Sequence, residues 1–322
     1  MYANMVKSRA FEAAIKAAYL EGKQPLFNMA KGPIPGEMHL SDGQEPCAVG
    51  VCAHLRVDDA VTATHRPHHI AIAKGVDLKA MAAEIFGRTS GLAGGRGGHM
   101  HLLDPAVNFS CSGIIGEGLG PAVGAAMAAK LRGKDSIAVA FLGEGAANQG
   151  AFHESLNLAA VWRAPVVFVI EDNRYGISVS KADCTAVARN SDRAAAYGMP
   201  GIFVEHNDPD AVFEAAGEAV ALARSGGGPT LIEIETMRLE GHFMGDAQAY
   251  RPKGEIDALM AKDPIPEYRN RLENEGVDTV ELAALEAAAR QQVNDAITYA
   301  RADAEPAADD AYAHVFVERA PT

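Results

Sequence analysis

The sequence predicts an α/β fold: a doubly wound, mostly parallel sheet with helices on both faces, plus helical N- and C-terminal segments. Two apolar runs, 137–142 and 166–170, have the length of fully buried strands, and a helix is expected between them over 148–162. The same order recurs later, with strand, helix and strand expected over 202–205, 210–224 and 230–236. Strands that alternate with helices are typical of parallel sheets covered on both faces.

The N-terminal third is expected to add helices and one short strand. Apolar side chains at helical spacing predict helices over 5–21, 45–55, 78–86 and 116–130. The last of these is so rich in small residues that it should be tightly buried. A strand over 60–64 ends in the cluster His65-Arg66-Pro67-His68-His69, whereas prolines and glycines make 25–43 a loop.

The C-terminal part is expected to be helical. Asp278 followed by Glu281 is typical of a helix start, and apolar positions continue from there to Ile297. The tail beyond Asp303 is expected to be weakly structured. The sequence therefore predicts an α/β domain over 1–260, followed by a helical segment and tail over 261–322.

Composition and charge exclude several classes of protein. The 322 residues carry 42 acidic and 29 basic side chains, and the net charge of −13 does not suit nucleic-acid or acidic-membrane binding. No apolar run approaches the roughly 18 residues that span a bilayer, and the N-terminal segment resembles an amphipathic helix rather than a signal peptide. The four cysteines have neither CxxC nor zinc-site spacing. A cytoplasmic protein with reduced thiols is expected.

Polar residues directly follow the two central strands. The segment Gly143-Glu144-Gly145-Ala146-Ala147-Asn148 comes after the first strand, and Asn173 follows the second. The carboxyl ends of neighbouring parallel strands meet at the edge of the sheet where ligands bind. Carboxylate and amide oxygens that do not form a full cage suit a Mg²⁺ ion that also takes phosphate oxygens. The sequence therefore predicts a site for a diphosphate and a metal ion.

The same glycines also resemble a dinucleotide-binding fingerprint, which leaves an NAD-dependent dehydrogenase as an alternative of another class. The third glycine of that fingerprint is replaced by Asn148. Glu144 between the first two glycines would repel a pyrophosphate unless a cation bridges the two. In such enzymes, the acidic residue that binds the ribose lies roughly 20 positions after the glycine loop. The acidic pair Glu171-Asp172 lies farther than this from Gly145. The metal-bridged site is therefore favoured.

As a set, these segments resemble the thiamine diphosphate motif in the alpha subunits of two-chain 2-oxo acid dehydrogenase first components. The likeness covers most of residues 5–255. The matching segments are Gly43–Glu45, Thr64–Gly75, Gly113–Gly116, Gly143–Gly150, Asn157–Trp162, Asn173–Gly176, Glu240–Asp246 and Ala249–Arg251. The resemblance implies a thiamine diphosphate-binding fold and the cofactors thiamine diphosphate and Mg²⁺. It argues against a non-catalytic assembly protein of the same fold, which would not need Arg66, His68 and His242 together.

The resemblance also implies the metal ligands. Glu144 and Asn173 would bind Mg²⁺ through side-chain oxygens, and Tyr175 would bind it through its carbonyl. The family usually carries aspartate where Glu144 stands. Because Mg²⁺ demands nearly octahedral contacts at about 2.0–2.1 Å, a shifted loop or another rotamer must absorb the extra methylene.

Backbone contacts to the cofactor follow from the same resemblance. Gly145 and Ala146 would offer backbone amides to the diphosphate. Gly113 and Ile115 would meet the aminopyrimidine ring through their main chain. These four residues and the metal ligands would together form the cofactor site.

The basic cluster that closes the strand over 60–64 is expected to face the same cleft. Arg66 suits a phosphate because its planar guanidinium has directed donors, and His65, where many relatives carry tyrosine, is expected to bond a phosphate oxygen. His68 and His242 fall where the family keeps histidines beside the cofactor. Both are expected to transfer protons, because imidazole titrates in the useful pH range.

The implied reaction is cleavage of a carbon–carbon bond next to a carbonyl, followed by transfer of the acyl unit to a lipoyl-bearing acyltransferase. The segment 240–248 is more similar to acetoin dehydrogenase alpha subunits than to pyruvate or branched-chain 2-oxo acid ones, which remain alternatives. In the family, a glutamate from the beta subunit contacts the pyrimidine ring. This chain alone should therefore be catalytically incomplete, and a heterotetramer of two alpha and two beta chains is expected.

Overall fold

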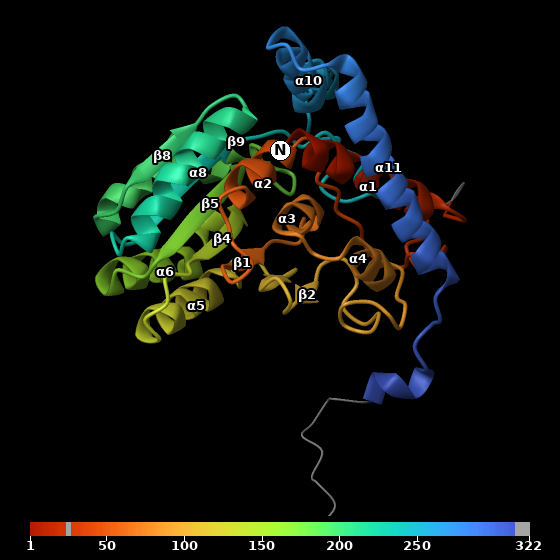
Figure 1. Ribbon diagram of the computed structural model, residues 1–322, viewed down its shortest axis with the longest axis horizontal. Helices are drawn as coiled ribbons and strands as arrows, with labels where there is room; N and C mark the ends of the chain where they lie inside the picture. The colour runs from red at the N-terminus through yellow and green to blue at the C-terminus, as the bar shows by residue number, and fades with distance from the viewer. Residues whose placement is uncertain (24–26, 313–322) are drawn as a thin grey trace, which may run out of the picture.

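The computed structural model describes residues 1–23 and 27–312. Its centre is a seven-stranded sheet in the order β2-β3-β1-β4-β5-β9-β8 (Figure 1). The strands are β1 (Ala60–Ala63), β2 (Leu103–Asp104), β3 (Phe109–Cys111), β4 (Ala138–Gly143), β5 (Val166–Asp172), β8 (Gly201–Val204) and β9 (Thr230–Glu235). β2 pairs antiparallel with β3, and the other described neighbours in this sheet pair in parallel. The predicted mostly parallel sheet is confirmed.

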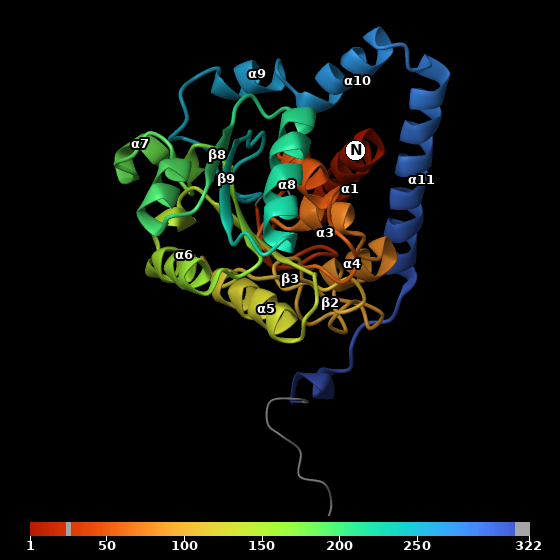
Figure 2. The same cartoon turned by 60° about the vertical axis from the view of Figure 1, so that its left-hand side comes forward.

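Helices cover both faces of the sheet because its central strands bury side chains on both sides. In β4, Val139 and Phe141 belong to one hydrophobic cluster, whereas Ala138, Ala140 and Leu142 belong to another. The first cluster includes residues of α1 (Tyr2–Leu20), α2 (Glu45–Cys52), α3 (His68–Lys74), α4 (Leu78–Ile85) and α8 (Pro209–Arg224). The second includes residues of α5 (Leu119–Leu131) and α6 (Gly150–Trp162), which lie together in Figure 2.

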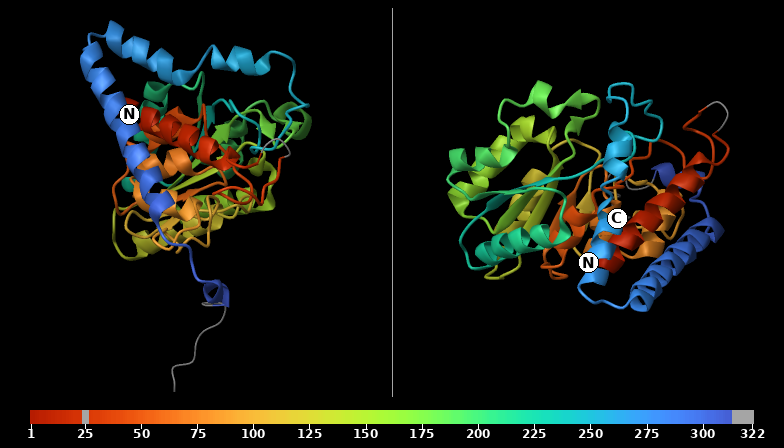
Figure 3. Two further views of the ribbon diagram at one scale, coloured as in Figure 1. Left: turned by 90° about the vertical axis from the view of Figure 1, so that its right-hand side faces the viewer. Right: turned by 90° about the horizontal axis from the view of Figure 1, so that it is seen from above.

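The C-terminal part, as far as the structure describes it, contains the α-helices α9 (Glu255–Met260), α10 (Pro264–Asn274) and α11 (Thr279–Ala302). The Asp278 side chain accepts a hydrogen bond from the Val280 N–H at 2.8 Å, which confirms the predicted helix start. α11 runs along the outside of α1 and α4 (Figure 3). It buries Val293 and Ala296, whereas the apolar side chain of Leu285 is exposed. Residues 313–322 of the expected tail lie outside the described residues.

Some elements differ from the expectation. The helix expected over 116–130 begins at Leu119, and it is not tightly buried: Gly120, Pro121 and Gly124 are exposed, because the helix packs on the sheet with one side only. Short pieces such as the hairpin of β6 (Tyr175–Gly176) and β7 (Val179–Ser180), and the helix α7 (Lys181–Cys184), are not predicted, because so few residues carry no periodic pattern. No helix within 1–23 and 27–312 is long and apolar enough to cross a membrane.

Candidate functional site

A cavity of about 750 Å³ opens at the carboxyl ends of β1, β4 and β5. Segments far apart in the sequence form its wall: the loop before α2, the residues after β1, the turn before α5, and the connections that follow β4, β5 and β9. Every site residue expected from the sequence, with the exception of His68, lines this cavity. These residues are His65, Arg66, Gly113, Ile115, Glu144, Gly145, Ala146, Asn173, Tyr175 and His242.

The three expected metal ligands lie together at the ends of β4 and β5. The backbone N–H of Asn173 donates to Glu144 Oε2 at 3.2 Å, and the backbone N–H of Tyr175 donates to Asn173 Oδ1 at 3.3 Å. The Glu144 side chain is buried, and burial, followed by the charge of Asp172, raises its pKa to about 7. A cation beside Glu144 would offset this penalty because it favours the ionised carboxylate.

The chain around Tyr175 brings two connections into close contact. Arg174, with a φ of 71°, turns the backbone before Tyr175. A Cβ atom on Gly145 would come within 3.3 Å of Gly176 Cα, so the approach of the two connections favours glycine at position 145. The Tyr175 carbonyl accepts a hydrogen bond from Arg238 Nη1 at 3.3 Å. A carbonyl oxygen has two lone pairs, so this bond leaves one for a further ligand.

Two other acidic residues at the end of β5 have partners of their own. Asp172 forms an ion pair with Lys181. Glu171, which lines the cavity, contacts His69 Nε2 through its Oε1 at 2.6 Å. Glu144, by contrast, has no ion-pair partner among the described residues. It is therefore the carboxylate that remains for a cation at this edge of the sheet.

Arg66 connects two segments of the cavity wall. Its Nη1 donates to the Leu40 carbonyl, and its Nη2 donates to the His242 carbonyl at 2.9 Å. Burial, followed by the charge of Arg238, lowers the pKa of Arg66 to about 10, which still leaves the guanidinium charged at neutral pH. The expected phosphate contact would have to share Arg66 with these two carbonyls.

Histidines gather along one side of the cavity. The ring centroids of His39 lie 4.8 Å from His65 and 5.1 Å from His242, and those of His65 and His242 are 5.3 Å apart. His39 Nδ1 lies 3.3 Å from His99 Nε2. Burial, followed by the charge of Arg66, lowers the pKa of His65 to about 3 and that of His242 to about 4. The same two causes lower the pKa of His39. These three rings are neutral at physiological pH.

The expectation that residues 65–69 all face one cleft is wrong. β1 ends at Ala63 and α3 begins at His68, so the alternation of a strand does not continue through this cluster. His68 and His69 are fully buried, and neither lines the cavity. His68 Nδ1 instead contacts Glu12 Oε2 of α1 at 2.9 Å.

The cavity also contains residues that no sequence pattern singles out. His39 comes from the irregular loop before α2, and Arg238 from the segment after β9, where no periodic pattern or motif marks them. Gln44 is buried in the cavity wall, and its Oε1 has no hydrogen-bond partner among the described residues. Its place in the segment Gly43–Glu45, which carries the family resemblance, is the one signal that could have pointed to it.

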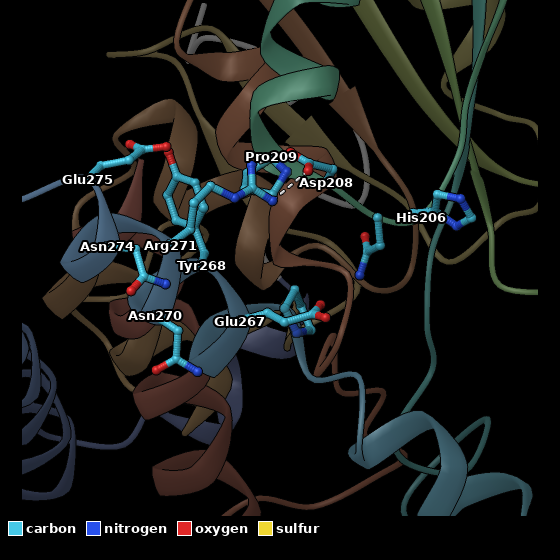
Figure 4. A pocket seen from close by; sticks show the side chains of 11 residues that line it. His206, Asp208, Pro209, Glu267, Tyr268, Asn270, Arg271, Asn274 and Glu275 are labelled. Carbon is cyan, nitrogen blue, oxygen red and sulfur yellow. Dashed lines mark hydrogen bonds and ion pairs between the residues drawn. The ribbon is translucent and has the colours of Figure 1, made fainter.

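A second hollow, of about 550 Å³, lies between the start of α8 and α10 (Figure 4). Arg271 points toward the α8 end and pairs with Asp208 at 2.6 Å and with Asp210 at 2.9 Å. The Tyr268 hydroxyl donates to Asp210 at 2.8 Å, and Asp208 caps α8. These groups satisfy one another, and the hollow contains none of the expected site residues. The cavity at the ends of β1, β4 and β5 is therefore the candidate site.

Comparisons with known proteins identify the family of this chain. The family model for the dehydrogenase E1 component matches residues 13–309. The alpha subunit of acetoin:2,6-dichlorophenolindophenol oxidoreductase from Bacillus subtilis is 43% identical over 319 residues, which cover 98% of this chain and 92% of that protein. Its counterpart from Cupriavidus necator is 44% identical over 300 residues, 90% of this chain and 88% of that protein. The pyruvate dehydrogenase E1 component subunit alpha of Rhizobium meliloti is 37% identical over 319 residues, with 98% and 89% covered. The chain therefore belongs to the dehydrogenase E1 component family.

Proposed function

We propose that this chain is the alpha subunit of a thiamine diphosphate- and Mg²⁺-dependent first component that cleaves a carbon–carbon bond next to a carbonyl, with acetoin as the favoured substrate. One observation carries the proposal: the buried carboxylate of Glu144 lies beside Asn173 at the ends of two parallel strands, inside a cavity of about 750 Å³. The 43% and 44% identity to subunits named for acetoin, against 37% for one named for pyruvate, supports the substrate.

The residues present fit a diphosphate held by a divalent cation. Glu144 is a buried carboxylate without an ion-pair partner among the described residues, and burial disfavours its ionised form. The positive charge of bound Mg²⁺ would stabilise that form. The Asn173 side chain and the Tyr175 carbonyl add oxygen donors of the kind that Mg²⁺ prefers. Gly145 and Ala146 offer backbone N–H groups beside them, and the closeness of the two connections leaves little room for a bulkier residue at 145.

The remaining cavity residues take the other roles. Thiamine diphosphate, when bound, supplies an electron sink for the bond cleavage. His65 and Arg66 would contact phosphate oxygens, and Gly113 and Ile115 would contact the aminopyrimidine through their main chain. His242, kept neutral by burial and by Arg66, can accept a proton on a ring nitrogen.

His68 would act differently from His242. Because it is fully buried and contacts Glu12, it would have to act through another group. We therefore assign His68 to positioning rather than to direct proton transfer.

A beta subunit would complete the site. Exposed apolar side chains border the cavity: Ile114, Ile115, Ile177 and Val179. A partner that covers them would remove apolar surface from water and close the cavity. We propose a heterotetramer of two alpha and two beta chains that passes its acyl unit to a lipoyl-bearing acyltransferase.

The proposal extends to the organisation of the chain. Residues 1–260 would form the thiamine diphosphate-binding domain, and 261–322 a helical segment and tail; the end of α9 at Met260 supports this boundary. The sheet would be doubly wound, because the strand order places β3 on one side of β1 and β4 on the other.

A reconstitution assay tests the proposed function. The chain is purified alone and together with a beta subunit, thiamine diphosphate and Mg²⁺ are added, and reduction of 2,6-dichlorophenolindophenol is followed with acetoin, pyruvate and branched-chain 2-oxo acids. We expect turnover only when both chains are present, and the highest rate with acetoin. Full turnover by this chain alone would contradict the shared site, and equal rates would remove the preference for acetoin. Reduction of NAD without thiamine diphosphate would favour the dehydrogenase alternative.

A further inference from the structure

Three histidines in the cavity form a cluster that Mg²⁺ binding does not require. His39, His65 and His242, here called the histidine triad, each place one possible ligand atom within 4.8 Å of the others. They come from three separate segments: the loop before α2, the residues after β1 and the segment after β9. Mg²⁺ prefers oxygen ligands, whereas imidazole suits Zn²⁺. We propose that the histidine triad is a second divalent-cation site of this chain, and that it binds Zn²⁺.

The triad is in the chemical form that binds a metal. A histidine ligand must be neutral, so protonation competes with metal binding. Burial and the charge of Arg66 hold the pKa of His65 at about 3 and that of His242 at about 4, so neither ring has to release a proton at neutral pH. His65 Nε2 is buried and has no hydrogen-bond partner among the described residues. A metal ion would satisfy this nitrogen.

The distances require only a small adjustment. Zn–N bonds of about 2.0–2.1 Å in tetrahedral geometry place ligand nitrogens about 3.3 Å apart. The triad's ligand atoms lie within 4.8 Å of one another, so a movement of about 1 Å by each ring brings them to this spacing. Three protein ligands leave a fourth position for water or a carboxylate. Glu37 Oε2, 4.0 Å from His39 Nε2, is the nearest candidate for that position among the described ion-pair contacts.

A neighbouring histidine supports the orientation of His39. His39 Nδ1 lies 3.3 Å from Nε2 of this neighbour, His99, and a hydrogen bond between these two atoms leaves Nε2 of His39 for a metal. Ligand histidines commonly use their other ring nitrogen in this way, and loss of such a partner typically weakens metal affinity about 10- to 100-fold. His99 is therefore a positioning residue for the site.

Nearby positive charges limit the affinity. Arg66 and Arg238 contribute to the lowered pKa of His65 and His242, and the same charges oppose a dication. The negative charge of Asp246 raises the pKa of His242 and so opposes the effect of the two arginines. We therefore expect a dissociation constant that is roughly micromolar, weaker than that of a structural zinc site.

Occupation of the triad has a consequence for catalysis that rests on the proposed function. Zn²⁺ bound to His242 would take the lone pair with which this ring accepts a proton, and Zn²⁺ bound to His65 would replace the phosphate contact that the proposed function assigns to this ring. We then expect Zn²⁺ to inhibit acetoin cleavage reversibly. Metal binding itself is measured without any turnover, so the Zn²⁺ site and the proposed function can fail independently.

The test measures metal binding to the full-length chain after removal of divalent cations. Zn²⁺ is titrated by calorimetry in excess Mg²⁺, and Co²⁺ is titrated as a probe, because tetrahedral Co²⁺ absorbs visible light much more strongly than six-coordinate Co²⁺. We expect binding at micromolar Zn²⁺ that Mg²⁺ does not abolish, together with the strong Co²⁺ absorption. Displacement of Zn²⁺ by Mg²⁺, or weak Co²⁺ absorption, would overturn the proposal.

Four variants connect this binding to the triad. His65→Tyr, which introduces the residue that many relatives carry, and His242→Gln each remove one ligand and should weaken Zn²⁺ binding at least about 100-fold. His99→Gln should weaken it about 10-fold. His206→Gln removes an exposed histidine outside the cavity and should leave affinity unchanged. Unchanged binding in both ligand variants, or equal loss in His206→Gln, would place the Zn²⁺ elsewhere and overturn the proposal.

Discussion

Replacement of Glu144 by glutamine should have opposite effects on folding and on cofactor binding. The variant keeps the size of the side chain and an oxygen that can accept the Asn173 N–H, but it removes the buried charge. In the metal-free chain, burial and Asp172 raise the pKa of Glu144 from 4.5 to about 7. This difference corresponds to about 3 kcal/mol of unfolding free energy.

The direction in which the unfolding free energy changes with pH follows from proton binding. Between pH 4.5 and about 7, the folded metal-free chain holds the Glu144 proton more tightly than the unfolded chain does, so this group lowers the stability as the pH rises. At pH 8, Glu144→Gln should therefore increase the unfolding free energy by up to about 3 kcal/mol, and the gain should vanish near pH 4. Urea unfolding of both proteins at several pH values in a metal chelator measures this difference.

Cofactor binding should change in the other direction. Without the carboxylate, the chain loses a charged Mg²⁺ ligand, and we expect thiamine diphosphate in Mg²⁺ to bind at least about tenfold more weakly, equivalent to about 1.4 kcal/mol. Glu214→Gln is the matched control, because it makes the same change at an exposed position of α8 outside the cavity and should leave cofactor affinity unchanged. Titration of thiamine diphosphate in the presence of the beta subunit compares the three proteins. If Glu144→Gln holds the cofactor as tightly as the parent, Glu144 is not a metal ligand.

Three further predictions follow from the geometry of the cavity. Gly145→Ala should weaken thiamine diphosphate binding, because its Cβ would press on the neighbouring connection at 3.3 Å. Gly120→Ala, at an exposed position of α5 outside the cavity where a Cβ meets nothing within 4 Å, should not weaken it, and equal affinities of the two variants in a titration would refute this reasoning. Protonation of His242 should reduce activity only near pH 4, because burial and Arg66 keep its pKa at about 4; an acidic limb near pH 6.5 that disappears in His242→Gln would contradict that environment. Asp246→Asn should raise the KM for acetoin, because Asp246 Oδ2 accepts a hydrogen bond from the His242 backbone N–H at 2.8 Å and so positions the segment that carries His242. An unchanged KM would show that other contacts hold this segment.

The strands and their tips could be predicted from the sequence because each depends on a local pattern. Apolar runs mark β4 and β5, and the parallel order of strands brings Glu144 and Asn173 to one edge without further information. Other parts of the site depend on the paths of irregular segments. His39 and Arg238 reach the cavity through such segments, which carry no period.

His68 illustrates a different limit. Its sequence neighbourhood is compatible with a continuing strand, but the chain starts α3 there, and the side chain turns into the interior toward Glu12. The choice between the two conformations depends on packing against α1, which lies far away in the sequence. The predicted tight burial of α5 is wrong for a similar reason. Small residues permit close packing, but they do not determine whether a second helix covers the other side of α5.

The most direct measurement is a crystal structure of this chain with a beta subunit, thiamine diphosphate and Mn²⁺ in place of Mg²⁺. We predict one anomalous peak within bonding distance of the Glu144 carboxylate, the Asn173 side chain and the Tyr175 carbonyl, with the diphosphate on its other side. A cofactor bound in another part of the molecule, or a metal ion that does not contact Glu144, would contradict the account.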